Sequence, residues 1–126
     1  DVDSVLAGLR AFNWPHMGDV HREPIGCFAR NDAGAVIGGV VGKIDWGWLT
    51  VEQLWVHDDY RGRGVGRELM ERVEGYALEK GVSRVRVETT SFQSLDFYRR
   101  LGYEVFAELP ECPPGAVNYY LKKVAE

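Results

Sequence analysis

The sequence lacks any run of about 18 apolar residues, the minimum length of a membrane-spanning helix. It also lacks a positively charged segment followed by an apolar one, which is the pattern of an export leader. The two absences predict a chain that neither spans a membrane nor is exported, and we expect a cytoplasmic location.

Cysteine and histidine are scarce as well. Among 126 residues there are two cysteines, Cys27 and Cys112, and three histidines. The cysteines are far apart, and no cysteine or histidine pair has the spacing of a metal site. We therefore expect no metal and the free thiols of an ordinary cytosolic protein, although the sequence leaves a disulfide open.

An excess of positive charge is also missing. The chain has 15 basic and 19 acidic residues, which give a net charge of −4. Such a chain has no general attraction to nucleic acid or to an anionic membrane surface, so we expect neither as a partner. What the chain does have is 45% hydrophobic and 12% aromatic residues, enough for one core in a single domain over residues 1–126.

Apolar spacing and turn residues divide the chain into helices and strands. The first helix, over 3–12, is expected to end at Asn13-Trp14-Pro15 because these residues break its pattern. The strongest helix, over 65–80, carries Val65, Leu69 and Val73 on one stripe and stops at Gly81. The other expected elements are three antiparallel strands within 25–57, a strand over 83–90, a helix over 93–101, and strands over 103–109 and 117–124.

The segment "HDDYRGRGVGRELM", from His57 to Met70, combines three glycines and three arginines where the strongest helix begins. Glycine lets a backbone approach an anion closely, and the N–H groups at the start of a helix attract negative charge. We therefore interpret residues 61–67 as a phosphate-binding loop. The GxGxG spacing does not match the dinucleotide or Walker pattern. A tight turn without a ligand is the alternative, and an RNA contact conflicts with the acidic net charge.

The same segment, extended back to Leu54, resembles motif A of the GNAT superfamily of acyl-CoA-dependent N-acetyltransferases. That motif has Arg or Gln, then Gly three positions later, then Gly or Ala two positions beyond, and Arg61, Gly64 and Gly66 meet it. Downstream, "FYRRLGYEVF" resembles motif B, with Tyr98 at the position of the usual catalytic tyrosine. The chain is similar in particular to small bacterial members of this family.

One position departs from the family pattern. Many members have Asn seven residues before the tyrosine, where this chain has Ser91. Gln93 is the expected substitute for the polar contacts that this position makes with pantetheine.

The resemblance implies an α/β fold of the single-domain GNAT type. Its mixed, mostly antiparallel sheet is splayed between two central parallel strands, here 51–56 and 84–89, and is flanked by helices. It also implies acetyl-CoA as co-substrate, with the thioester in the splayed gap. The expected binding residues are Leu54, Trp55 and Val56 beside pantetheine, Arg61, Gly62, Arg63, Gly64, Val65, Gly66 and Arg67 at the pyrophosphate, and Ser91 and Gln93.

The implied activity is transfer of the acetyl group to a primary amine of a small molecule or peptide, by direct attack in a ternary complex. A base must remove the amine proton, a donor must stabilise the thioester oxygen, and an acid must protonate the leaving thiolate. We assign Glu52 as the base, a strand amide within 54–56 as the donor and Tyr98 as the acid. A solvent-facing Glu52 and a core Tyr98 are the structural alternatives.

In the helix over 93–101, we expect Phe97 and Leu101 to anchor the helix on the core. The Tyr98 phenol, with an ordinary pKa of about 10, should then reach out at the helix edge. For the whole protein, a non-catalytic acyl-CoA sensor or interaction module is the alternative to an enzyme. The sequence does not specify the acceptor amine, and it leaves a homodimer open.

Overall fold

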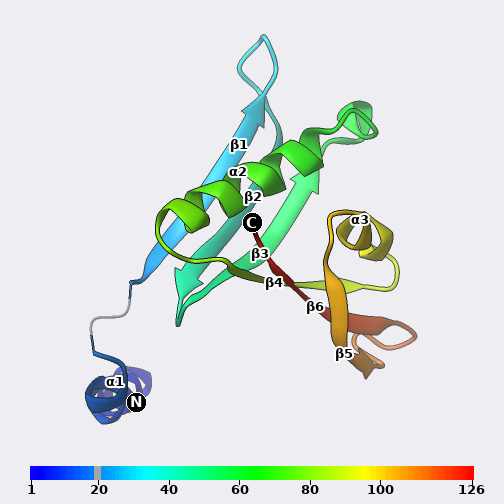
Figure 1. Cartoon of the computed structure of the whole chain (residues 1–126). Helices are drawn as coiled ribbons and strands as arrows, with labels where there is room; N and C mark the ends of the chain where they lie inside the picture. Colours follow the sequence, from blue (N-terminus) through cyan, green and yellow to red (C-terminus); the bar gives the residue numbers. More distant parts are fainter. Residues whose placement is uncertain (19–20) are drawn as a thin grey trace.

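The computed structural model describes residues 1–18 and 21–126 (Figure 1). Each helix and strand expected from the sequence is present, and the described residues hold no helix long and apolar enough to cross a membrane. Cys27 and Cys112 are both free thiols. In chain order the elements are α1 (Val2–Met17), β1 (Glu23–Arg30), β2 (Val36–Asp45), β3 (Trp48–Val56), η1 (Asp58–Tyr60), α2 (Val65–Glu79), β4 (Arg84–Thr90), α3 (Leu95–Arg100), β5 (Glu104–Pro110) and β6 (Val117–Val124).

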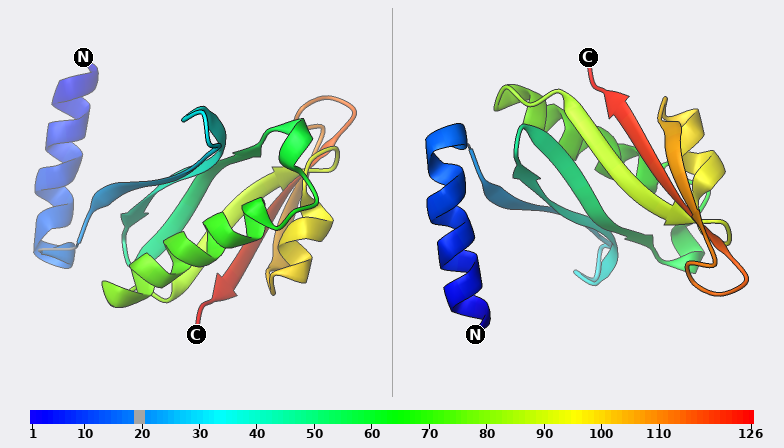
Figure 2. Two further views of the ribbon diagram at one scale, coloured as in Figure 1. Left: turned by 90° about the horizontal axis from the view of Figure 1, so that it is seen from above. Right: turned by 90° about the horizontal axis from the view of Figure 1, so that it is seen from below.

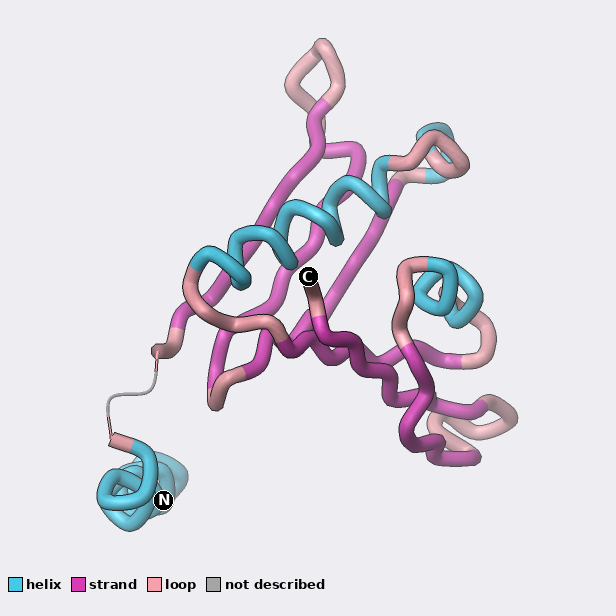
Figure 3. The backbone as a smooth tube through the Cα atoms, in the orientation of Figure 1, coloured by secondary structure: helices cyan, strands magenta, loops and turns pink. Residues whose placement is uncertain are grey.

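The six strands form one sheet in the order β1-β2-β3-β4-β6-β5 (Figure 3). β1, β2 and β3 are antiparallel neighbours, as the hairpin pattern predicted. β4 lies parallel to β3, because the helix α2 connects the two strands as a crossover. β6 is antiparallel to both β4 and β5. The predicted α/β fold, with a mostly antiparallel sheet around a central parallel pair, is confirmed.

Both α2 and α3 contribute to one hydrophobic core on the same face of the sheet (Figure 2). Strand β4 shows the alternation that separates the two faces, since Val85 and Val87 are buried in this core whereas Arg84, Arg86 and Glu88 are exposed. We call the face to which Arg84, Arg86 and Glu88 point the open face, because neither α2 nor α3 covers it.

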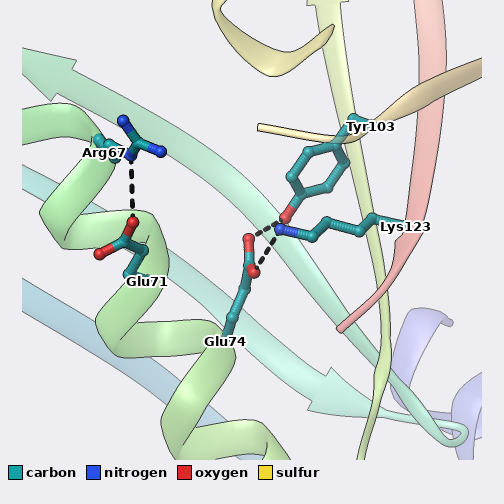
Figure 4. Close-up of polar contacts among 5 residues, drawn as sticks. All are labelled: Arg67, Glu71, Glu74, Tyr103 and Lys123. Atoms are coloured by element: carbon teal, nitrogen blue, oxygen red, sulfur yellow. Dashed lines mark hydrogen bonds and ion pairs between the residues drawn. The ribbon is translucent and has the colours of Figure 1, made fainter. Parts of the chain in front are cut away.

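A buried carboxylate ties α2 to the C-terminal half of the sheet (Figure 4). Glu74 is only 7% exposed. The Tyr103 hydroxyl donates a hydrogen bond to its Oε2 (2.6 Å), and Lys123 Nζ donates one to its Oε1 (2.9 Å). Burial and the bond to Glu74 raise the pKa of Tyr103 well above its usual range, so the hydroxyl remains a donor. Because both donors are in place, the buried charge fixes α2 against β6.

The first helix is longer than the sequence indicated. α1 continues through Pro15 to Met17, so the expectation that Asn13-Trp14-Pro15 ends it is wrong. Proline has no N–H to donate within the helix, and only two helical residues follow it. The last turn is closed instead by Gly18, whose N–H donates to the carbonyl of Trp14 (2.9 Å).

A β-bulge interrupts the pairing of β2 with β3. Val41 is paired with Gln53 whereas Gly42 is paired with Val51, so Glu52 has no partner in β2. A side chain at position 42 would overlap the carbonyl oxygen of Thr50. The parallel pairing of β3 with β4 ends at Val51 and Val87, so the sheet opens where the bulge bends β3.

The bulge leads to a prediction about stability. In Gly42→Ala the added methyl group must displace the backbone at Thr50, and we expect the free energy of unfolding to fall by about 2–3 kcal/mol. The matched control is Gly75→Ala, because an added methyl group there has nothing within 4 Å and α2 should gain about 0.5–1 kcal/mol. Urea unfolding of both variants provides the measurement, and equal midpoints would contradict this role of Gly42.

Candidate active site

Two cavities meet where the sheet opens. The larger, about 720 Å³, lies among the end of β3, the glycine loop, the start of α2, and α3. The smaller, about 420 Å³, includes the open-face side chains of Thr50 and Arg86. Both cavities are lined by Val51, Glu52, Val87 and Glu88, the residues around the end of the parallel pairing. Molecules bound in the two cavities could therefore meet at this gap.

The glycine loop borders the larger cavity between β3 and α2. Gly62 (φ 76°) and Gly64 (φ 82°) adopt left-handed backbone conformations, and a Cβ at either position would meet nothing within 4 Å. Arg61 anchors the loop through Nε, which donates to the carbonyl of Val56 (3.0 Å), and through an ion pair with Asp58 (3.0 Å). The loop is thus held at its start and open to a ligand at its glycines.

The N-terminus of α2 offers free hydrogen-bond donors to this cavity. Its capping residue, Gly64, has no side chain, and the first intrahelical bond is the one that Glu68 donates to Gly64 (3.0 Å). The N–H groups of Val65, Gly66 and Arg67 precede that bond, and all three residues line the larger cavity. This arrangement is suited to an anion such as a phosphate.

The three arginines of the loop have different surroundings. Arg61 and Arg67 line the larger cavity. Arg67 is also paired through Nε with Glu71 (3.1 Å), one turn further along α2 (Figure 4). Arg63 does not line the cavity, and its guanidinium lies over the ring of Tyr60, 5.5 Å from the centroid. Two of the three arginines therefore line the same cavity as the free N–H groups of α2.

The end of β3 forms one wall of the larger cavity. Leu54, Trp55 and Val56, the residues expected beside pantetheine, all line it. Beyond Val51 the strand has no partner on the β4 side, so its backbone groups there can hydrogen-bond an extended ligand.

The two polar residues between β4 and α3 are placed differently. Gln93 lines the larger cavity, and its Oε1 accepts a hydrogen bond from the Thr90 N–H (2.9 Å). Ser91 is not among the lining residues, and its hydroxyl accepts a hydrogen bond from the Val117 N–H (3.1 Å). Ser91 therefore connects this turn to β6 in the structure.

Tyr98 lines the larger cavity from α3 and is only 4% exposed. Phe97 and Leu101 pack against the core, as expected, but the expectation that Tyr98 reaches out at the helix edge is wrong. Both flanking residues are half-buried, whereas Tyr98 packs edge-on against the rings of Phe97 (5.1 Å) and Tyr103 (5.7 Å). Burial raises the pKa of Tyr98 to about 12, so the phenol stays protonated at neutral pH.

Glu52 lies at the gap because it is the extra residue of the bulge. Its side chain is exposed and lines both cavities. A second carboxylate that was not expected from the sequence, Glu88, lines both cavities and accepts a hydrogen bond from Asn118 Nδ2 (3.1 Å). The alternation of "RVRVETT" contains the signal for it, since Arg84, Arg86 and Glu88 must share one face of β4.

Comparison with known proteins agrees with this geometry. Residues 5–103 match the acetyltransferase (GNAT) family. A blasticidin-S acetyltransferase of Streptomyces morookaense is 41% identical over 97 residues, which are 76% of this chain and 71% of the relative. The chain therefore belongs to the GNAT family of acetyltransferases.

Solved structures share the same fold. An acetyltransferase from Bacillus cereus matches with a TM-score of 0.85 and 24% identity, covering 98% of this chain and 91% of that chain. A Bacillus anthracis protein, assigned as a streptothricin acetyltransferase and solved in complex with acetyl coenzyme A, has a TM-score of 0.73 and 21% identity. That match covers 86% of this chain and 65% of the other.

Proposed function

We propose that the protein transfers the acetyl group of acetyl-CoA to a primary amine of a small molecule. Acetyl-CoA would occupy the larger cavity and the amine the smaller one. The observation that carries this proposal is that the two cavities meet where β3 leaves β4. Acetyl-CoA and the amine can then approach the gap from opposite faces of the sheet. Direct attack of the amine on the thioester requires that both reactants be held at the gap in one ternary complex.

The residues around the larger cavity fit the co-substrate. The free N–H groups of α2 and the side chains of Arg61 and Arg67 favour a pyrophosphate. The unpaired end of β3 favours an extended pantetheine chain. The acetyl coenzyme A in the Bacillus anthracis structure supports this assignment, and the blasticidin-S acetyltransferase relative supports a small-molecule acceptor.

The transfer forms a carbon–nitrogen bond and breaks the carbon–sulfur bond of the thioester. The amine gives up one proton, and the sulfur departs as a thiolate that takes up a proton. We assign a backbone N–H within 54–56, on the wall of the larger cavity, to the stabilisation of the thioester oxygen. Glu52 and Tyr98 both line the larger cavity. We assign Glu52 to remove the proton of the amine and Tyr98 to stabilise the departing sulfur.

Glu52 serves as the base in this proposal, directly or through a water molecule. In Glu52→Gln we expect kcat at neutral pH to fall on the order of a hundredfold, with acetyl-CoA affinity close to that of the wild type. The loss should shrink as pH rises, because more of the amine is then already neutral. Steady-state kinetics between pH 6 and 9 measure this, with Glu88→Gln as the control for loss of a neighbouring charge. A loss that is equal at all pH values would assign the base elsewhere.

Tyr98 serves as a hydrogen-bond donor to the leaving sulfur. Its pKa of about 12 lies above that of a thiol, about 8.5, so complete proton transfer to the thiolate would be uphill. A hydrogen bond from the buried phenol stabilises the developing charge without that transfer. The proton that the thiolate finally takes up would then come from solvent. Tyr98 would therefore act as a hydrogen-bond donor and not as the general acid expected from the sequence.

The prediction for Tyr98→Phe follows from this role. We expect kcat to fall by roughly ten- to a thousandfold at every pH from 6 to 9, because the phenol stays protonated throughout this range. Tyr103→Phe is the matched control. It removes the hydroxyl bonded to Glu74, so it should lower the free energy of unfolding by about 1–3 kcal/mol and leave kcat unchanged. Normal turnover by Tyr98→Phe would show that the hydroxyl has no role in catalysis and that Tyr98 only contributes to packing.

The glycine loop is tested by binding of CoA. Gly64→Glu puts a carboxylate where the pyrophosphate would lie, and Gly64→Ala imposes the same left-handed strain without the charge. We expect Gly64→Glu to weaken CoA binding by more than about a hundredfold and Gly64→Ala by less than about tenfold. Calorimetric titration measures both affinities, and melting curves show that both variants are folded. Equal affinities would exclude a phosphate at this loop.

The proposed function itself is tested by thiol release from acetyl-CoA in the presence of a panel of amines, with mass analysis of the products. Amine-dependent release together with an acetylated amine is the expected result. Tight CoA binding without turnover across the panel would favour the alternative, an acyl-CoA sensor.

A further inference from the structure

We propose that the acceptor carries a carboxylate several bonds away from its amine, and that Arg86 and Lys43 bind this carboxylate on the floor of the smaller cavity. The inference rests on the proposed function, because it names the class of amine that the same site would take.

A row of paired residues crosses the open face of the sheet. Lys43 is paired with Thr50, Thr50 with Arg86, and Arg86 with Lys122. Directly opposed residues on neighbouring strands point to the same face, so the row places three cations in one line, with Thr50 between Lys43 and Arg86. Lys43, Thr50 and Arg86 line the smaller cavity, whereas Lys122 Nζ lies over the Phe106 ring (5.5 Å). Two of the cations are thus available to a ligand.

Arg86 is oriented by a contact that leaves its outer nitrogens free. Its Nε donates a hydrogen bond to Thr50 Oγ1 (2.8 Å), which fixes the guanidinium against β3. Within residues 1–18 and 21–126, neither Arg86 nor Lys43 has a carboxylate at ion-pair distance. A guanidinium held in this way presents planar donors that match a carboxylate.

The other end of the smaller cavity has the opposite charge. Glu52 and Glu88 lie two residues beyond Thr50 and Arg86, which is about 7 Å along a strand, and they flank the gap. The rings of Phe106 and Tyr120, with centroids 6.4 Å apart, also line the cavity. The cavity is therefore acidic at the gap and cationic at its floor, and its wall on the β5–β6 side is apolar.

The positions of these charges favour some classes of amine as acceptor over others. An ammonium group fits at the gap beside the carboxylates, and an anion fits at the floor beside Arg86 and Lys43. A polyamine would place a second cation against Arg86. In glycine a single carbon separates the amine from the carboxylate, so it cannot reach both ends. An amine joined to a carboxylate through an extended apolar spacer satisfies both ends at once.

The experiment compares 6-aminohexanoate with hexylamine, which has the same spacer and no carboxylate. In the wild type we expect kcat/KM to be at least about tenfold higher for 6-aminohexanoate. Arg86→Gln should reduce this ratio at least about fivefold, and Lys43→Gln should reduce it less, because Lys43 is not oriented by a hydrogen bond. Arg84→Gln is the matched control, since Arg84 shares the strand and face but does not line the cavity, and it should keep the wild-type ratio.

The outcomes separate this inference from the proposed function. Acetylation of both amines at equal kcat/KM, or a ratio that Arg86→Gln leaves unchanged, would overturn the inference and leave the acetyltransferase proposal standing. If neither amine is acetylated, calorimetric titration with the same two compounds decides. Preferential binding of 6-aminohexanoate that is lost in Arg86→Gln supports the carboxylate site, and equal binding of the two compounds overturns it.

Discussion

One extra residue in β3, Glu52, determines where β3 separates from β4, and its side chain lies in the resulting gap. Glu52 has no partner in β2, and the pairing of β3 with β4 ends at the residue before it. The bend requires a glycine at position 42, because any side chain there would meet the Thr50 carbonyl. The same bend brings the Glu52 carboxylate to both cavities. The gap between the central strands and the carboxylate inside it therefore have a single structural cause.

The glycine loop adds a second constraint. Its three glycines are evenly spaced in the sequence, but they are required for two different reasons. Gly62 and Gly64 are required by their left-handed backbone, and they leave open space where a phosphate would lie. Gly66 is required by close packing, since a Cβ there would be 3.2 Å from the Phe97 ring. That contact brings α3 against the start of α2, and α3 carries Tyr98. The segment that would bind the phosphate is thus also in contact with the helix that carries Tyr98.

The sequence predicted the features that depend on local pattern. The hairpin, α2 and the loop follow from alternation, an apolar stripe and glycine spacing, and the structure contains all three. Features that depend on distant partners could not be predicted. Ser91 is directed toward Val117, 26 residues away, and the depth of Tyr98 depends on the Tyr103 ring. The alternation of β4 is enough to predict the face to which Arg86 points. That Lys43 and Thr50 are its neighbours follows only from the order of the strands in the sheet.

The charges along the proposed path of the reaction alternate in sign, although the chain as a whole is acidic. Arg61 and Arg67 line the far part of the larger cavity, the carboxylates Glu52 and Glu88 flank the gap, and Arg86 lies on the floor beyond it. A reactant that is anionic at its far end would therefore be oriented with its reactive end toward the gap, from either face of the sheet. Tyr98, which lines the larger cavity, is a neutral donor, and its burial would strengthen a hydrogen bond to a developing thiolate. The alternating charges would then orient the two reactants, and the bulge and the phenol would act at the point where they meet.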